Sequence, residues 1–94
     1  MALILYMELE FYIPFAHSLK EKRSFIKSLK DKLKNRFNIA VAEIDYIDSW
    51  QKSLIGVVSI SNSKQVLDKL SLQILSYIEN YFPGTLLNYY IDIS

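Results

Sequence analysis

Apolar and polar residues alternate over the first stretch of the chain. From Leu3 to Ile13 every second residue is a large apolar one, whereas Glu8 and Glu10 fall on the opposite side. A period of two with one apolar face is typical of a half-buried β-strand. Pro14, which has no backbone N–H to donate, ends this predicted strand.

A helical period follows. Ser18 and Glu21 predict a capping box, in which the serine hydroxyl accepts from the amide of Glu21 and the Glu21 carboxylate accepts from the amide of Ser18. The helix is predicted to run to about Arg36. Its expected core stripe, at spacings of three and four residues, consists of Leu19, Phe25, Ile26, Leu29 and Leu33.

Further strands are predicted over residues 37–47, 54–61 and about 86–93. The alternation in the first of these is ambiguous, because Ile39 and Val41 share a face with Glu43 and Asp45. A bulge near Ala42 would resolve the conflict.

A second helix is predicted over about 63–81. Asn62 is its expected N-cap, with Gln65 at the capping-box position, and Pro83-Gly84 ends it. The side chains expected to be buried on this helix are Val66, Leu67, Leu70, Ile74, Tyr77, Ile78 and Tyr81.

The element order is β-α-β-β-α-β, which is that of the ferredoxin-like fold or α/β plait. Right-handed crossovers then predict an α+β sandwich, in which a four-stranded antiparallel sheet of order 4-1-3-2 carries both helices on one face. Ninety-four residues leave room for one core, so residues 1–94 are expected to form a single domain.

Charge is unevenly distributed. Residues 18–38 hold eight basic residues and two acids, a net of +6, whereas the remainder holds three basic residues and eight acids, a net of −5. Lysines and one arginine recur at alternating spacings of three and four residues, which lines them up along one edge of the first helix. These five residues are Lys20, Arg23, Lys27, Lys30 and Lys34.

We interpret this basic row as a contact for RNA or ribosomal particles, with His17 and Arg36 at its ends, because successive cations can neutralise successive phosphates. A solvated helix face and an acidic protein partner are the alternatives. The measurement that separates them is the salt dependence of RNA binding.

Catalysis is not expected. His17 is the only histidine, there is no cysteine, and no phosphate loop or dinucleotide fingerprint occurs. The carboxylates of Glu8 and Glu10 are expected on a solvated outer face of the sheet. We therefore expect a non-enzymatic accessory protein without a metal or cofactor; small-molecule binding would rest on analogy of fold alone.

The outer face of the sheet offers a second hypothesis, a protein-interaction or homodimer interface around Tyr6, Tyr12 and Trp50. Glu8 and Glu10 between the two tyrosines would repel phosphate, so RNA is not expected to dock there. Trp50 itself is expected to be buried or partly buried.

Several segments resemble the YlxP-like family of small bacterial proteins. The resemblance is carried by residues 17–23 (His-Ser-Leu-Lys-Glu-Lys-Arg), 35–38, 41–43, 50–51, 56–57 and 61–62. It implies a ferredoxin-like fold and no known activity, and the usual genomic neighbourhood of the family among transcription and translation factors suggests a connection with RNA or the ribosome. The family pattern is matched at His17, Lys20, Lys22, Arg23, Asn35, Arg36, Trp50 and Gln51.

Two positions depart from that pattern. Tyr46 stands where relatives often have histidine, which weakens any histidine-centred site, and Phe15 replaces the glycine of the family's Pro-Gly-Ala-His approach to the helix.

No apolar run approaches the ~20 residues of a membrane span, and the first residues lack the basic stretch of a signal peptide. A cytoplasmic location is therefore expected.

Overall fold

Four strands and two helices follow one another in the predicted order. The computed structural model describes residues 1–94. Its elements are β1 (Leu3–Tyr12), α1 (Leu19–Arg36), β2 (Ala40–Asp45), β3 (Lys52–Ser61), α2 (Lys64–Tyr81) and β4 (Leu86–Ile93).

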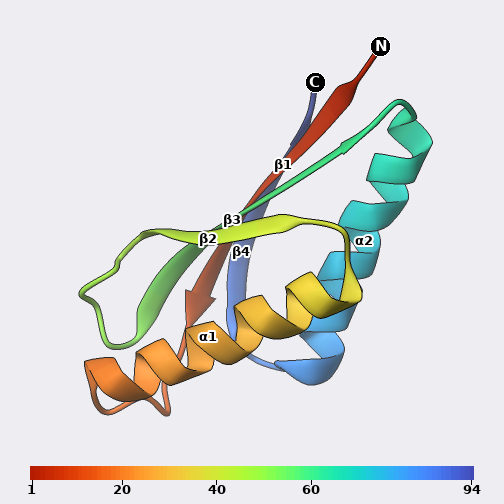
Figure 1. Ribbon diagram of the computed structural model, residues 1–94. Coiled ribbons are helices and arrows are strands. Elements are labelled where there is room, and N and C mark those ends of the chain that lie inside the picture. Colours follow the sequence, from red (N-terminus) through yellow and green to blue (C-terminus); the bar gives the residue numbers. More distant parts are fainter.

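The strands form one antiparallel sheet of order β2-β3-β1-β4, which is the predicted order read from the opposite edge. β1 lies in the middle, so that Met7 pairs with Val57 of β3 on one side and with Ile91 of β4 on the other. The first and last residues lie side by side, since Ile4 and Ser94 exchange backbone hydrogen bonds of 2.8 and 3.0 Å (Figure 1).

Both helices cover the same face of this sheet (Figure 1). The inward side chains of β1 and β3 form one apolar cluster with residues of both helices, which confirms the inward face predicted for β1. The helical members of the cluster are Ile26, Leu29 and Leu33 from α1 and Leu67, Ile74 and Ile78 from α2. Neither helix combines the length and the apolar character needed to cross a membrane.

A bulge does interrupt β2, the strand with the ambiguous alternation. It lies two residues after the predicted position. The register of β2 against β3 shifts between Glu43 and Asp45, so the extra residue is Ile44 and not Ala42. Val41 pairs with Val57 and Glu43 with Ile55, both of which are buried on the helix side. A carboxylate therefore does point toward the helices.

Two expectations for α2 are wrong. The N-cap is Ser63, whose hydroxyl accepts from the amide of Val66, and not Asn62. Both residues are good caps, so propensity alone does not separate them. Val66 and Tyr81 are exposed and not in the core, and the small Ser71 takes a buried place on this helix.

Candidate nucleic-acid interface

The start of α1 is held by the predicted cap with one change of partner. The Ser18 hydroxyl accepts from the amide of Glu21 at 3.1 Å. The Glu21 carboxylate accepts from the amide of His17 at 2.7 Å and not from that of Ser18. The reciprocal bond thus fixes the residue before the cap as well, and it orders the entry of the chain into the helix.

The basic row predicted on α1 is on the surface. Lys20, Arg23, Lys27 and Lys34 are exposed, and Lys30 is half-buried. At 1.5 Å per residue the row spans about 21 Å along the helix axis. It is long enough to lie against several successive phosphates of a nucleic-acid strand.

One acid interrupts this row. Lys27 donates to Asp31 at 2.9 Å in an exposed i,i+4 pair. That hydrogen bond, together with the charges of Lys27, Lys34 and Lys30, lowers the pKa of Asp31 below its usual range, against a smaller opposing effect of desolvation. The carboxylate therefore releases its proton at a lower pH than an ordinary aspartate, and its pair with Lys27 is lost only as the pH falls through this lowered pKa.

Arg36 is not part of the row. At 100° per residue it lies roughly 160° around the helix axis from Lys34, on the flank of α1 that faces α2. Lys32 lies on the same flank, where its ammonium is 5.4 Å from the ring centre of Phe82. Arg36 lines a cleft with residues of α2. The structure thus brings together the five residues of the basic row and separates Arg36 from them.

Lys22 of α1 lies outside the predicted basic row, and the sequence pattern alone assigned it no interaction. Its side chain is 0% exposed, and its ammonium lies 2.6 Å from a carboxylate oxygen of Glu43, itself 15% exposed. The remaining contacts are hydrogen bonds of 2.9 and 3.3 Å to the backbone carbonyls of Tyr46 and Ile47. Three acceptors thus meet the three N–H donors of the ammonium.

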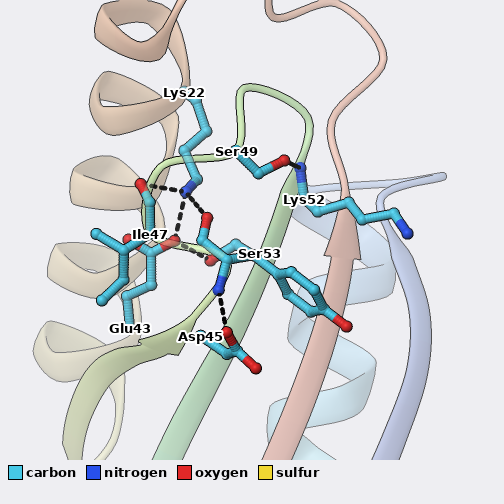
Figure 2. A network of polar contacts seen from close by, with 8 residues as sticks. Lys22, Glu43, Asp45, Ile47, Ser49, Lys52 and Ser53 are labelled. Carbon is cyan, nitrogen blue, oxygen red and sulfur yellow. Dashed lines mark hydrogen bonds and ion pairs between the residues drawn. The ribbon is translucent and has the colours of Figure 1, made fainter.

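Figure 2 shows how this network joins two parts of the molecule. Lys22 reaches from α1 to the connection between β2 and β3, and Ser53 of β3 donates to the same Glu43 oxygen at 2.6 Å. A buried charge is tolerated only when it is paired and fully hydrogen-bonded, so the network fixes α1 against this connection.

The connection turns through Tyr46, which has a φ of 60°. This left-handed conformation is uncommon for residues other than glycine, and histidine adopts it more readily than most. The histidine that the family resemblance implies at this position would adopt this conformation more readily than tyrosine.

A sequence signal for the pair was present. Lys22 lies three residues after Leu19 and four before Ile26, on the core stripe of α1. Glu43 alternates with the apolar Ile39 and Val41. A basic and an acidic residue that both point inward from adjacent elements indicate a buried ion pair. Because Lys22 is neutralised inside the protein, the charge that α1 presents to solvent is smaller than its composition indicates.

The loop before α1 is tied to the connection after β2. The side-chain amide of Gln51 donates to the backbone carbonyls of Pro14 and Ala16 at 3.2 and 3.3 Å. The backbone amide of Ile13 donates to the backbone carbonyl of Gln51 at 2.8 Å. His17 is exposed in this loop. Trp50 is 56% exposed, so it is not a core residue, although part of its surface is covered.

Residues of the family pattern thus divide into two groups. Lys22 and Gln51 hold the two loops together from inside, whereas the other six are exposed, namely His17, Lys20, Arg23, Asn35, Arg36 and Trp50.

The remaining predicted residues do not form one cluster: Tyr6 and Tyr12 lie on the outer face of β1, and Trp50 lies in the connection between β2 and β3. The Tyr6 hydroxyl donates to Glu8 at 2.6 Å, and this hydrogen bond raises the pKa of Tyr6. Tyr12 pairs with Lys52 at the other end of β1, which is the end nearer to Trp50. Tyr6 instead borders a shallow apolar depression of about 190 Å³ formed mainly by β2 and β3. No three histidine, aspartate or glutamate side chains lie close enough together to hold a metal ion.

Comparison with known proteins identifies relatives by sequence and by fold. Residues 4–91 match the family described as "Protein of unknown function (DUF503)". The chain is similar to the "Uncharacterized protein YlxP" of Bacillus subtilis (strain 168), with 34% identity over 76 residues that cover 81% of this chain and 83% of the relative.

Two designed proteins are similar in structure. One is the "De novo designed protein Foldit4", with a TM-score of 0.59 and 12% identity over 100% of this chain and 97% of that one. The other is the "De novo designed protein Ferredog-Diesel", with a TM-score of 0.52 and 13% identity over 95% of this chain and 83% of that one. At such identities the likeness concerns the fold alone.

Replacing Lys22 by methionine should lower the free energy of unfolding by about 3–5 kcal/mol, because Glu43 would remain charged without its cation. The double variant Lys22→Met/Glu43→Met should recover most of this loss, since no unpaired charge remains and Tyr46 and Ile47, which carry the two loop carbonyls, are exposed residues. Urea unfolding measures both. Equal losses in the single and the double variant would contradict the assigned role of the pair.

Proposed function

The chain belongs to the DUF503 family of proteins of unknown function, and we propose that it is a non-enzymatic protein that binds RNA, free or in ribosomal particles, through the basic row of α1. The observation that carries this proposal is the row itself, five cations on one helical edge of which four are exposed. Such a row is complementary to a phosphate backbone and requires no particular base sequence.

The distribution of the other basic residues supports this choice of surface. Lys22 forms an ion pair with Glu43 inside the protein, and the ammonium of Lys32 lies over the ring of Phe82, on the flank of α1 that faces α2. These two cations of α1 are thus placed where they contribute to the packing of the fold. Apart from the exposed pair of Lys27 with Asp31, no ion pair involves a residue of the row, and cations at spacings of three and four residues repel one another within the helix.

The opposite face of the molecule is unsuited to phosphate. The outer face of β1 carries Glu8 and Glu10 between Tyr6 and Tyr12, and Asp92 of the neighbouring strand β4 pairs with Tyr6. An RNA strand on this face would meet carboxylates at its centre. The α1 side is therefore the electrostatically favoured surface.

Binding of the wild-type protein to unstructured single-stranded RNA should depend steeply on salt. Five neutralised phosphates predict a slope of about −3.5 for log K against log salt concentration. Lys27→Glu/Lys30→Glu should weaken binding more than tenfold at low salt and reduce the slope to about −2, since three cations remain. Fluorescence anisotropy with a labelled oligonucleotide measures both quantities.

Lys64→Glu/Lys69→Glu is the matched control, because it makes the same change in net charge on α2 and likewise includes one lysine of an i,i+4 pair, Lys64–Asp68. It should bind nearly as well as the wild type. Equal weakening in both double variants would reduce the effect to net charge, and no binding by the wild type at low salt would refute the proposal.

Asp31→Asn should act in the opposite direction. The variant removes the one carboxylate within the row and releases Lys27 from its pair. Affinity for RNA should rise about two- to threefold at low salt, the effect of one unit charge roughly 8 Å from a phosphate in water. Asp68→Asn, in the corresponding pair on α2, is the control; an unchanged or reduced affinity of Asp31→Asn would count against phosphate contact at the row.

A homodimer through the outer sheet face is the second candidate function. The observation that favours it is an exposed apolar area around Tyr6, made up of Ile4, Ile44, Val58 and Ile60. Cross-strand pairing joins Ile4 to Ile60 and Tyr6 to Val58, so the area is continuous. Exposed apolar areas of this kind mark interaction surfaces, and a second copy of the chain would cover it with the same residues.

Light scattering at tens of micromolar should then give twice the mass of one chain. Ile60→Lys, at the most exposed member of the area, should restore the single mass, whereas Ile47→Lys in the exposed loop should not. A single mass for the wild type at every concentration rules this candidate out.

A further inference from the structure

A cleft of about 390 Å³ lies between the end of α1 and the second half of α2. Arg36 and Phe37 line it from the α1 side, and the facing positions of α2, at spacings of three and four residues, are Gln73, Ser76, Tyr77, Asn80 and Tyr81. Its volume is within the range of small-molecule sites. No carboxylate lines it.

The aromatic rings of this cleft support one another. Phe37 meets Tyr77 edge to face at 5.7 Å between ring centres, and Tyr77 lies against Tyr81 at 4.5 Å with an angle of 33° between the planes. Tyr81 is nevertheless 64% exposed. The ring is thus held in place by Tyr77 while much of its surface remains open, as a preorganised stacking platform requires.

The polar groups complement such a platform. Arg36 takes part in none of the three ion pairs of the chain, so its guanidinium is available to an anion. The amides of Gln73 and Asn80 each offer donors and an acceptor, a combination suited to the polar edge of a nucleobase.

The C-terminal end of α1 also affects where the base and the phosphate of a nucleotide would lie. The C-terminus of a helix carries a partial negative charge, which disfavours an anion beside its last carbonyls. A neutral base is therefore favoured within the cleft, and its phosphate is favoured outside, where Arg36 can reach it.

From this arrangement we propose that the cleft binds one unstacked nucleotide, with the base stacked on Tyr81, its edge facing Gln73 and Asn80, and its phosphate at Arg36. The proposal rests on the proposed function, since it names an unpaired residue of the bound RNA as the source of this nucleotide. A free mononucleotide shares the same chemistry and is distinguished by the experiment. Duplex RNA, whose bases are stacked and paired, does not fit.

The experiment compares a ten-nucleotide single-stranded RNA with the same sequence in a blunt duplex. The wild type should bind the single strand more tightly. Tyr81→Leu should weaken single-strand binding roughly 5- to 150-fold, the range of one base–aromatic stack, and should leave duplex binding unchanged. Tyr89→Leu, which removes a tyrosine of comparable exposure (54%) from β4, is the control and should change neither affinity.

A second measurement keeps the cleft testable if RNA binding itself fails. AMP and CMP are titrated into the isotope-labelled protein, and the ring signals of Tyr77 and Tyr81 and the guanidinium signal of Arg36 are followed by NMR. Shifts at all three residues in the wild type, with those of Tyr77 and Arg36 lost in Tyr81→Leu, would support a nucleotide site even without RNA binding, with the free mononucleotide as its source. RNA binding that Tyr81→Leu leaves unchanged, or the absence of any shift with both nucleotides when RNA does not bind, would overturn the proposal.

Discussion

The burial of one ammonium group constrains the arrangement of the whole basic helix. Lys22 has no access to water, and each of its three donors meets an acceptor, the Glu43 carboxylate or a carbonyl of the connection after β2. Breaking a buried pair of this kind leaves an uncompensated charge, so the rotation of α1 about its own axis has little freedom. The bulge at Ile44 comes directly after Glu43, where the chain leaves the inner face and begins its turn around the ammonium.

That constraint determines which side of α1 each cation faces. With Lys22 inward, a regular helix sends the row from Lys20 to Lys34 to the surface away from α2, and it turns Lys32 and Arg36 toward α2. A helix that looks uniformly basic in composition thus has one long phosphate-complementary edge and one separate arginine beside an aromatic cleft. The two surfaces are suited to different parts of one ligand, the backbone of a strand and an exposed base.

Much of this could be predicted from the sequence, because the strands and helices have clear periods. The order of the sheet and the inward face of β1 follow from alternation and crossover handedness, and the row follows from spacing alone. Lys22 was missed because lysine usually reaches solvent. Glu43 was missed because a bulge near Ala42, ahead of it, would have turned its carboxylate outward, whereas the observed bulge lies after it. Arg36 was assigned to the row although its angular position separates it. The cleft depends on how α1 and α2 cross, which no local pattern determines, and the exposure of Trp50 and Tyr81 likewise depends on tertiary placement.

The central claim is that RNA meets the outward edge of α1. Its most direct test is NMR mapping of the wild-type protein with a single-stranded RNA at low salt, in which the signals of all residues are followed together. The account predicts that the largest shifts fall on the exposed lysines and Arg23 of the row, and that the outer-face residues of β1 and β3 are unchanged. Shifts concentrated around Tyr6, Val58 and Ile60, with none along α1, would contradict it.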